Sequence, residues 1–259
     1  MGSLSASADL ALLVIPGAAS PASFYEDFVT EVRKVTGLQV DVYSNPSGAV
    51  SDPPAGLTED GRFWASKIEE LSSQGKEVIL VPHSYGGLVA NEAAKGLEVA
   101  VRQQQSLTGG VKRIIYVTCV VGGVGETSSE VCSPLDFDWL LPMDGNDQFV
   151  INTDRGAHRV YNDMPLAKAQ SFIPKMSPQS VKSFNDKIVS DSYTHIPMTY
   201  VLCTRDNCLT PEWQEGRIAW LQSQRQQPVE TVRLDADHFP QLGATQATAK
   251  VVADVVAGL

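Results

Sequence analysis

The chain has 259 residues, of which 43% are hydrophobic and 19% charged, a balance that suits one globular domain with a substantial core and excludes a disordered or fibrous chain. Thirty acidic residues outnumber twenty basic ones, so the formal net charge is −10 and the pI is near 4.8. Such a charge balance does not favour phosphate backbones or anionic lipid surfaces. We therefore expect neither a nucleic acid nor a membrane as a partner.

The N-terminal segment predicts a first strand and no membrane anchor. Its apolar run, Leu10 to Ile15, is too short to cross a bilayer, and no basic segment precedes it. Gly2 is present, but position 6 is Ala6, where the myristoylation pattern needs serine or threonine. We expect a soluble, cytoplasmic protein, and the sequence is compatible with a homodimer.

The cysteines match no zinc or redox spacing. There are four of them: Cys119, Cys132, Cys203 and Cys208. Buried free thiols are the favoured interpretation. A disulfide between Cys203 and Cys208 is the alternative, which a cytosolic location argues against.

Segments with strand and helix patterns alternate along the chain. The expected strands are 10–15, 38–43, 77–82, 113–121, 197–204 and 229–234. The expected helices are 24–37, 57–75, 86 to about 105, 212–224 and 246–259. The run EVILVP at 77–82 is apolar almost throughout, as in a strand covered on both faces. This order predicts an α/β fold with a mostly parallel central sheet and helices on both faces.

The alternation breaks between residues 122 and 195. This stretch has helical patches but no convincing buried strand, and it is too long for a structureless loop in a compact domain. We predict a core made of 1–121 and 196–259, with 122–195 inserted as a helical cap over one edge of the sheet.

Ser84 lies in LVPHSYGGLVANEAA, where an apolar strand leads directly into a helix. Ligand crevices of α/β folds lie at such carboxyl ends of strands. Gly86 and Gly87 allow the helix to pack closely, and the turn would then present the Ser84 hydroxyl together with the N–H of Tyr85. The alternative is that Ser84 only caps the helix.

A serine nucleophile needs a base and an orienting acid. His238 follows the last expected strand and Asp206 follows the strand before it, so both would reach the same sheet edge as Ser84. Asp206 could instead be a turn or capping residue before Pro211. The competing histidines are His83, beside the serine, and His158 and His195, in or next to the cap. The competing acids are Asp235 and Asp237.

Four motifs, VIPGAAS, VPHSYGGLVA, YVLCTRDNCLTP and DADHFP, occur in this order over nearly the whole chain. They resemble those of α/β-hydrolases, in particular the small capped type that includes plant methylesterases and hydroxynitrile lyases. The resemblance implies an α/β-hydrolase fold with Ser84 as nucleophile, His238 as general base and acid, and Asp206 as orienting carboxylate. It also implies that the N–H of Ala18 joins that of Tyr85 in an oxyanion hole.

The chain departs from the family pattern at three positions. Pro82 stands where glycine usually precedes the nucleophile by two residues, and Pro16 replaces a histidine before the oxyanion glycine. Phe239 follows the catalytic histidine where serine is common, and it would narrow the pocket.

The resemblance implies a hydrolase that cleaves a small, largely uncharged carboxylic ester or lactone through an acyl-enzyme. No metal or organic cofactor is needed, and no dinucleotide or P-loop motif is present. An apolar cluster in the cap either lines the pocket or packs the cap onto the core: Phe137, Trp139, Leu140, Leu141 and Met143. Arg155 or Arg159 could serve an anionic acyl group.

Two other function classes remain open on the same scaffold. In a lyase or cyclase, His238 would act as a base and Ser84 would only position the substrate. In a small-molecule receptor the triad would be vestigial. A small-molecule ligand is common to all three hypotheses.

Overall fold

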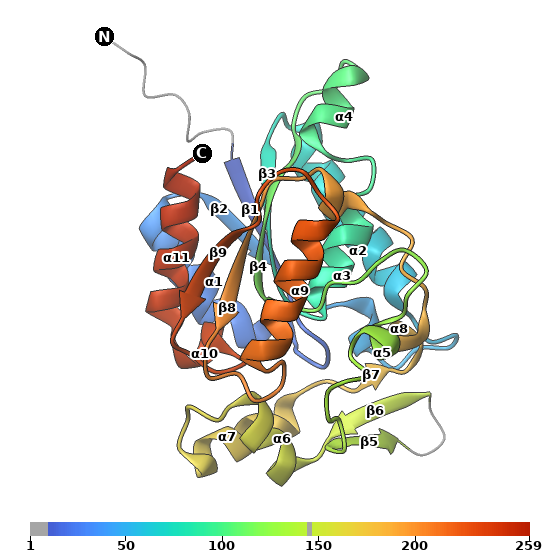
Figure 1. Cartoon of the computed structure of the whole chain (residues 1–259), viewed down its shortest axis with the longest axis vertical. Coiled ribbons are helices and arrows are strands. Elements are labelled where there is room, and N and C mark those ends of the chain that lie inside the picture. The colour runs from blue at the N-terminus through green and yellow to red at the C-terminus, as the bar shows by residue number, and fades with distance from the viewer. Residues whose placement is uncertain (1–9, 144–146) are drawn as a thin grey trace.

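A computed structural model describes residues 10–143 and 147–259 (Figure 1). Gly2 and Ala6, used above to test for myristoylation, lie outside the described residues. Within the described part, no helix combines the length and the apolar character that crossing a membrane requires.

Six parallel strands form the central sheet in the order β2-β1-β3-β4-β8-β9. Their bounds are β1 Leu10–Ile15, β2 Gln39–Val42, β3 Glu77–Ser84, β4 Gly110–Cys119, β8 Met198–Cys203 and β9 Glu230–Leu234. Parallel strands need crossovers, and helices supply most of them. The parallel α/β sheet predicted from the sequence is confirmed.

Helices cover both faces of this sheet, as Figure 1 shows. On one side α1 (Glu26–Thr36) packs against α11 (Thr245–Ala257), and on the other lie α2 (Leu57–Ser73), α3 (Gly86–Ala94) and α9 (Pro211–Ser223). Shorter elements of the core are η1 Ala22–Tyr25, η2 Pro46–Gly48, α4 Val99–Gln104 and α10 Pro240–Gly243.

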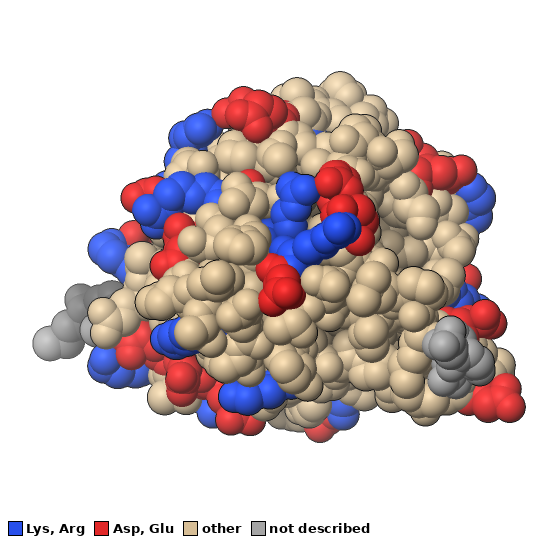
Figure 2. Space-filling model, turned by 90° about the horizontal axis from the view of Figure 1, so that it is seen from below, with Lys and Arg blue, Asp and Glu red and all other residues tan. Residues whose placement is uncertain are grey.

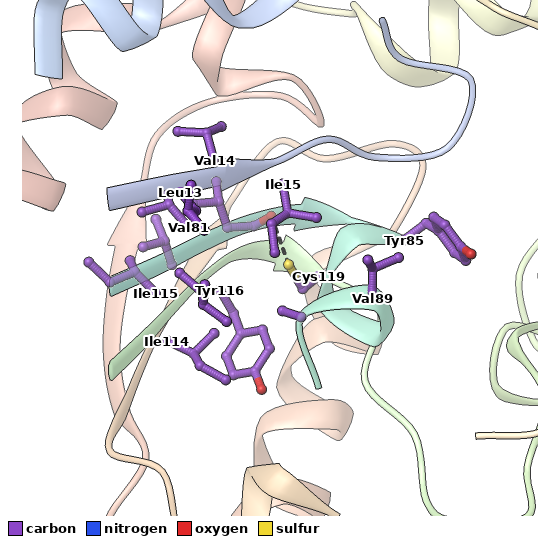
Figure 3. Close-up of a cluster of buried hydrophobic side chains, with 14 of the residues drawn as sticks. Leu13, Val14, Ile15, Val81, Tyr85, Val89, Ile114, Ile115, Tyr116 and Cys119 are labelled. Atoms are coloured by element: carbon purple, nitrogen blue, oxygen red, sulfur yellow. Dashed lines mark hydrogen bonds between the residues drawn. The ribbon is translucent and has the colours of Figure 1, made fainter. Parts of the chain in front are cut away.

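The core lies where the central strands meet α3. Leu13, Val14 and Ile15 of β1 pack beside Val81 of β3 and the apolar residues of β4 (Figure 3). These strands have almost no solvent-exposed side chains before their carboxyl ends. Burial on both faces fixes those ends firmly, which is what a site built on them requires.

The single helix expected from 86 to about 105 is two helices. Gly96 adopts a left-handed φ of 78° after α3 ends, and Val111 donates its N–H to the Leu97 carbonyl before the chain re-enters the sheet. A glycine at positive φ ends a helix because it pays no Cβ penalty there. As a result β4 begins at Gly110, three residues earlier than expected.

The segment 122–195, which we call the insertion, is less helical than the sequence predicted. It carries a three-stranded antiparallel sheet in the order β5-β6-β7. Its elements are α5 Ser128–Val131, β5 Leu140–Met143, β6 Gln148–Ile151, α6 Thr153–Val160, α7 Leu166–Phe172, η3 Ile173–Lys175, β7 Gln179–Ser180, α8 Lys182–Asn185 and η4 Ser192–Thr194. Strands of two to four residues are too short to show a period-two pattern, so they could not be predicted from the sequence.

The insertion lies below the carboxyl ends of the sheet strands (Figure 1). Seen from below, basic and acidic side chains lie beside each other on this face, among wide uncharged areas (Figure 2). The charges of Arg155 and Arg159 are paired with Asp138 and Asp136. All four cysteines are buried and free, which confirms the prediction for them.

Candidate active site

Ser84, His238 and Asp206 come together at the carboxyl ends of the strands. Nε2 of His238 lies 3.0 Å from the Ser84 hydroxyl, and Nδ1 lies 2.8 Å from Oδ2 of Asp206. A carboxylate only accepts, so Nδ1 carries the proton and Nε2 is free to accept the serine O–H. This is the arrangement that prepares a serine for nucleophilic attack.

Ser84 lies on a strained turn between β3 and α3. Its φ of 52° is left-handed, which costs a non-glycine residue energy and has to be held by the surrounding packing. Gly86 and Gly87 allow that packing: a Cβ on Gly86 would lie 2.6 Å from the Ile15 carbonyl oxygen, and one on Gly87 only 2.4 Å from that of Val120. The turn therefore depends on both glycines having no side chain.

We expect Gly87→Ala to lower the free energy of unfolding by at least about 2 kcal/mol, because the new methyl meets rigid backbone. For a chain of this size that corresponds to a fall in melting temperature of about 4 to 8 °C. Gly216→Ala, in α9 with no atom within 4 Å of the new Cβ, is the matched control and should not lower it. Equal melting temperatures for both variants would contradict the packing argument.

Asp206 is buried and held by donors on both oxygens. Oδ1 accepts the N–H groups of Cys208 and Leu209 at 2.7 and 2.8 Å. Oδ2 accepts the Thr118 hydroxyl at 2.5 Å in addition to the imidazole. Thr118 has a left-handed φ of 41°, so this contact too is made from a strained backbone. The carboxylate is oriented before any substrate binds.

The competing residues lie elsewhere. Asp237 accepts the N–H groups of Asp163 and Phe239, and Asp235 is an exposed partner of Arg205. Neither carboxylate bonds an imidazole. His158 and His195 are exposed, so the structure leaves His238 as the histidine that contacts Ser84.

His83, beside the serine, is buried and holds the loop that carries His238. Its Nε2 lies 2.7 Å from the carbonyl oxygen of His238, and its Nδ1 lies 2.7 Å from the hydroxyl of Tyr25. A carbonyl only accepts, so Nε2 carries the proton and Nδ1 accepts from Tyr25. Burial, helped by the charge of His238, lowers the pKa of His83 well below 6.5 and keeps the ring neutral.

His238 has the opposite shift. Burial by itself lowers the pKa of this imidazole, but Asp206 and Cys208 together outweigh burial and raise the pKa well above 6.5. A general base must be neutral to accept a proton, so the active form lies on the alkaline side of this pKa.

We expect kcat/KM for an ester substrate to fall as the pH drops through the pKa of His238, with a midpoint above 6.5. The measurement is a pH–rate profile at constant ionic strength, with circular dichroism at each pH to show that the protein stays folded. A midpoint at or below 6 in a folded protein would contradict the raised pKa.

Ala18 and Tyr85 line the same cavity as Ser84, and their backbone N–H groups differ from those of their neighbours. Gly17 and Ala19 donate theirs to Tyr25 and Gln179, but among the described residues the N–H of Ala18 donates to no protein group, and the same holds for Tyr85. Unpaired donors from two strand ends are what an oxyanion hole requires.

A cavity opens at Ser84 between the sheet edge and the insertion. The lining includes Ser84 and His238 and is otherwise largely apolar and aromatic, with Phe137, Trp139, Leu140, Phe149, Phe184 and Phe239 among its residues. Within the described part of the chain, no aspartate, glutamate, lysine or arginine lines it. The cavity therefore suits a neutral, apolar molecule.

The predicted lining residues divide into two groups. Phe137, Trp139 and Leu140 line the cavity, whereas Leu141 and Met143 do not. Alternate residues of a strand point to opposite sides, so in β5 the face that carries Leu140 points into the cavity and the face with Leu141 and Met143 points away. Arg155 and Arg159 are also outside the lining, paired with aspartates.

The three departures from the family pattern are accommodated. β3 runs through Pro82 to Ser84, with a register shift against β4 between His83 and Ser84. The Pro16 carbonyl accepts the side-chain N–H of Asn45. Phe239 is fully buried against Tyr25 and lines the cavity.

Three further residues contact the site and carry no sequence signal of their own. Thr118 lies in an apolar strand and donates to Asp206. Asp60 lies near the start of α2 and accepts the Tyr85 hydroxyl, and Gln179 lies in the insertion and accepts the N–H of Ala19. Their partners are distant in sequence, and no local pattern marks such contacts.

Among the described residues, no group of three histidine, cysteine, aspartate or glutamate side chains is placed to hold a metal ion.

Comparison with known proteins points to one family and one fold. Residues 12–254 match the family model described as the alpha/beta hydrolase family. A probable hydrolase, R7, from Phoma sp. (strain ATCC 20986 / MF5453) is 25% identical over 94% of this chain and 97% of its own length. The alpha/beta hydrolase nvfD from Aspergillus novofumigatus (strain IBT 16806) is 27% identical over 93% of this chain and 94% of its own.

Solved structures show the same fold at low identity. A pyrethroid hydrolase from Sphingobium faniae JZ-2 has a TM-score of 0.73 and 19% identity, and covers 96% of this chain and 98% of its own. The methylesterase MES16 from Arabidopsis has a TM-score of 0.71 and 17% identity, and the match covers 96% of this chain and 100% of the methylesterase. Polyneuridine aldehyde esterase has a TM-score of 0.74 and 12% identity, and the match covers 96% of this chain and 99% of the esterase.

Proposed function

The chain belongs to the α/β-hydrolase family, and on that premise we propose that it is a serine hydrolase that cleaves a small, largely uncharged carboxylic ester or lactone. The observation that carries the proposal is the hydrogen-bonded series Asp206, His238 and Ser84, which ends in an apolar cavity. Two curated relatives named as hydrolases, and structural neighbours named methylesterase and esterase, support it.

The residues divide the chemistry between them. Ser84 attacks the acyl carbon while His238 accepts its proton, and the N–H groups of Ala18 and Tyr85 receive the developing oxyanion, a contribution of about 3 kcal/mol per donor. His238 then protonates the leaving alcohol and activates a water that hydrolyses the acyl-enzyme. Asp206 keeps the imidazole in the useful tautomer and stabilises its cation.

The lining argues for the substrate class. An anionic acyl group would lose its hydration in a cavity that no described lysine or arginine lines, whereas a neutral ester buries apolar surface worth about 25 cal/mol per Å². The aromatic residues of the insertion, Phe137 and Trp139 above all, offer edges and faces to a ring or an alkyl chain. We infer an apolar acyl or alkoxy group on the substrate.

The test uses a fluorophosphonate probe and a panel of chromogenic esters and lactones. We expect the probe to label Ser84, with multiple turnovers of neutral esters and at least tenfold lower kcat/KM for analogues with a carboxylate on the acyl group. Labelling with one turnover or none would indicate a receptor. Full activity of Ser84→Ala on a native substrate would indicate lyase or cyclase chemistry.

A further inference from the structure

Asp60, on the first turn of α2, is a fully buried carboxylate outside the triad. Its Oδ1 accepts the N–H of Ser47 at 2.8 Å, and its Oδ2 accepts two hydroxyls, from Ser47 at 2.5 Å and Tyr85 at 2.8 Å. Among the described residues, no lysine, arginine or histidine pairs with it. Burial raises the pKa of Asp60 to about 6, against the lowering effect of these bonds.

One of these hydroxyls belongs to the residue that follows Ser84. The backbone N–H of Tyr85 is a candidate oxyanion donor, while its side chain points away from the packed strands (Figure 3) and its hydroxyl donates to Asp60. The ring also stacks on Phe184 of α8, with centroids 5.7 Å apart. Asp60 thus holds the turn on which Ser84 keeps its left-handed φ.

The same network reaches the other side of the oxyanion hole through the insertion. The Ser47 hydroxyl accepts an N–H of Gln179 at 2.8 Å, and the side-chain oxygen of Gln179 accepts the backbone N–H of Ala19 at 2.8 Å. Ala19 follows Ala18 and is itself left-handed, with a φ of 55°. The second N–H of Gln179 donates to Ser183, so its side-chain amide is fully used.

Every donor in this series points toward the carboxylate. Ala19 donates to Gln179, Gln179 to Ser47, and Ser47 and Tyr85 to Asp60. All five residues are at most 1% exposed. Hydrogen bonds in one direction, ending on a charge in a low dielectric, polarise and strengthen one another, so the series resists displacement at both ends.

We infer that Asp60 is a positioning residue of the oxyanion hole, which fixes the Tyr85 turn and the Ala18 loop relative to each other, and that Gln179 makes the insertion part of this support. The inference rests on the proposed function, because it concerns the hole that would stabilise the oxyanion. It does not depend on which ester the protein cleaves.

The other ionisable groups around Asp60 are accounted for. On α2 the charge of Glu59 adds to the raised pKa of Asp60, and on α8 Lys182 pairs with both Glu59 and Asp186. On α3 Glu92 accepts the N–H groups of Val189 and Ser190. Burial and the Asp60 charge raise the pKa of Tyr85, which therefore stays neutral. Asp60 is thus the group of this network that titrates near pH 6.

We expect Asp60→Asn to lower kcat for a chromogenic ester by about 10- to 100-fold and to leave KM within about threefold. The oxyanion contacts are made in the transition state, and a displaced donor should cost less than the 10²- to 10³-fold loss of a deleted one. Tyr85→Phe keeps the backbone and the stacked ring and removes one bond to Asp60, so it should lose about 3- to 10-fold in kcat. The rate of fluorophosphonate labelling of Ser84 should fall in parallel.

The pH profile separates positioning from a general loss of structure. In the wild type, log kcat/KM should fall with a slope of one below the pKa of His238. It should fall more steeply below about pH 6, where protonation of Asp60 adds a further loss of the size expected for Asp60→Asn. In Asp60→Asn the slope should stay at one. A wild-type slope of one down to pH 5 in folded protein would overturn the inference.

Glu92→Gln is the matched control. Glu92 is partly buried, has a raised pKa like Asp60, and accepts the backbone N–H groups of Val189 and Ser190. The variant should keep kcat within twofold. If Ser84→Ala abolishes turnover but Asp60→Asn and Tyr85→Phe keep kcat within twofold, the positioning inference fails while the proposed function stands. If Ser84→Ala keeps its turnover, the proposed function itself fails.

Discussion

Ser84→Ala and His238→Ala should each lower kcat/KM for a neutral ester by at least about a thousandfold. The expected loss is this large because the two groups act as one unit: without the hydroxyl no acyl-enzyme forms, and without the imidazole the hydroxyl keeps its proton. Residual activity comes from the oxyanion donors and substrate binding alone. Because the effects belong to one unit, the double variant should be hardly slower than either single one.

The measurement is steady-state turnover with a chromogenic ester, with fluorophosphonate labelling as a second readout that Ser84→Ala should abolish. Ser66→Ala, an exposed serine of α2, and His158→Ala, an exposed histidine of the insertion, are the matched controls and should keep activity within twofold. A drop of less than tenfold in both Ser84→Ala and His238→Ala would refute the assignment.

Much of the fold and the triad could be predicted because their signals are local. The apolar run of β3 followed by Gly86 and Gly87 predicts a strand, a tight turn and a helix within a dozen residues. Asp206 and His238 each follow a strand directly. Since parallel strands end at one sheet edge, their order along the chain was enough to predict that they meet.

The residues that support the site could not be predicted because their contacts are not local. Asp60 meets Tyr85 across 25 residues, and Gln179 meets Ser47 across 132 and Ala19 across 160. In the sequence, Asp60 is one of several polar residues at a helix start. Acidic side chains are common there because the helix dipole places partial positive charge at the N-terminus. Only the packing of α2 against the turn after Ser84 shows that it faces inward.

The insertion marks another limit of the sequence signal. Its apolar residues were identified, but which of them face the cavity depends on the register of β5, a four-residue strand that ends at Met143. A shift of one residue would exchange Leu140 for Leu141 in the lining. Neighbouring strand β6 sets that register by pairing Leu140 with Ile151, and no pattern within β5 itself does so.

Asp206→Asn should lower kcat by about 10³- to 10⁴-fold, nearly as much as loss of the base, although it changes one atom. The N–H groups of Cys208 and Leu209 both point at Oδ1, so an asparagine must keep its oxygen there. Its NH₂ group then faces His238 and donates to Nδ1. The imidazole is forced into the tautomer with its proton on Nε2, which no longer accepts the proton of Ser84.

The Asp206→Asn variant should lose catalysis and keep substrate binding. Binding should be nearly unchanged, so KM stays within about threefold while kcat falls, and fluorophosphonate labelling slows by a similar factor to kcat. Asp235→Asn, an exposed carboxylate paired with Arg205, is the control and should keep full activity. A mild loss of kcat in Asp206→Asn together with a severe loss in Asp237→Asn would indicate that Asp237 is the orienting acid. The structure argues against that outcome, because both oxygens of Asp237 accept backbone N–H groups and neither contacts the imidazole.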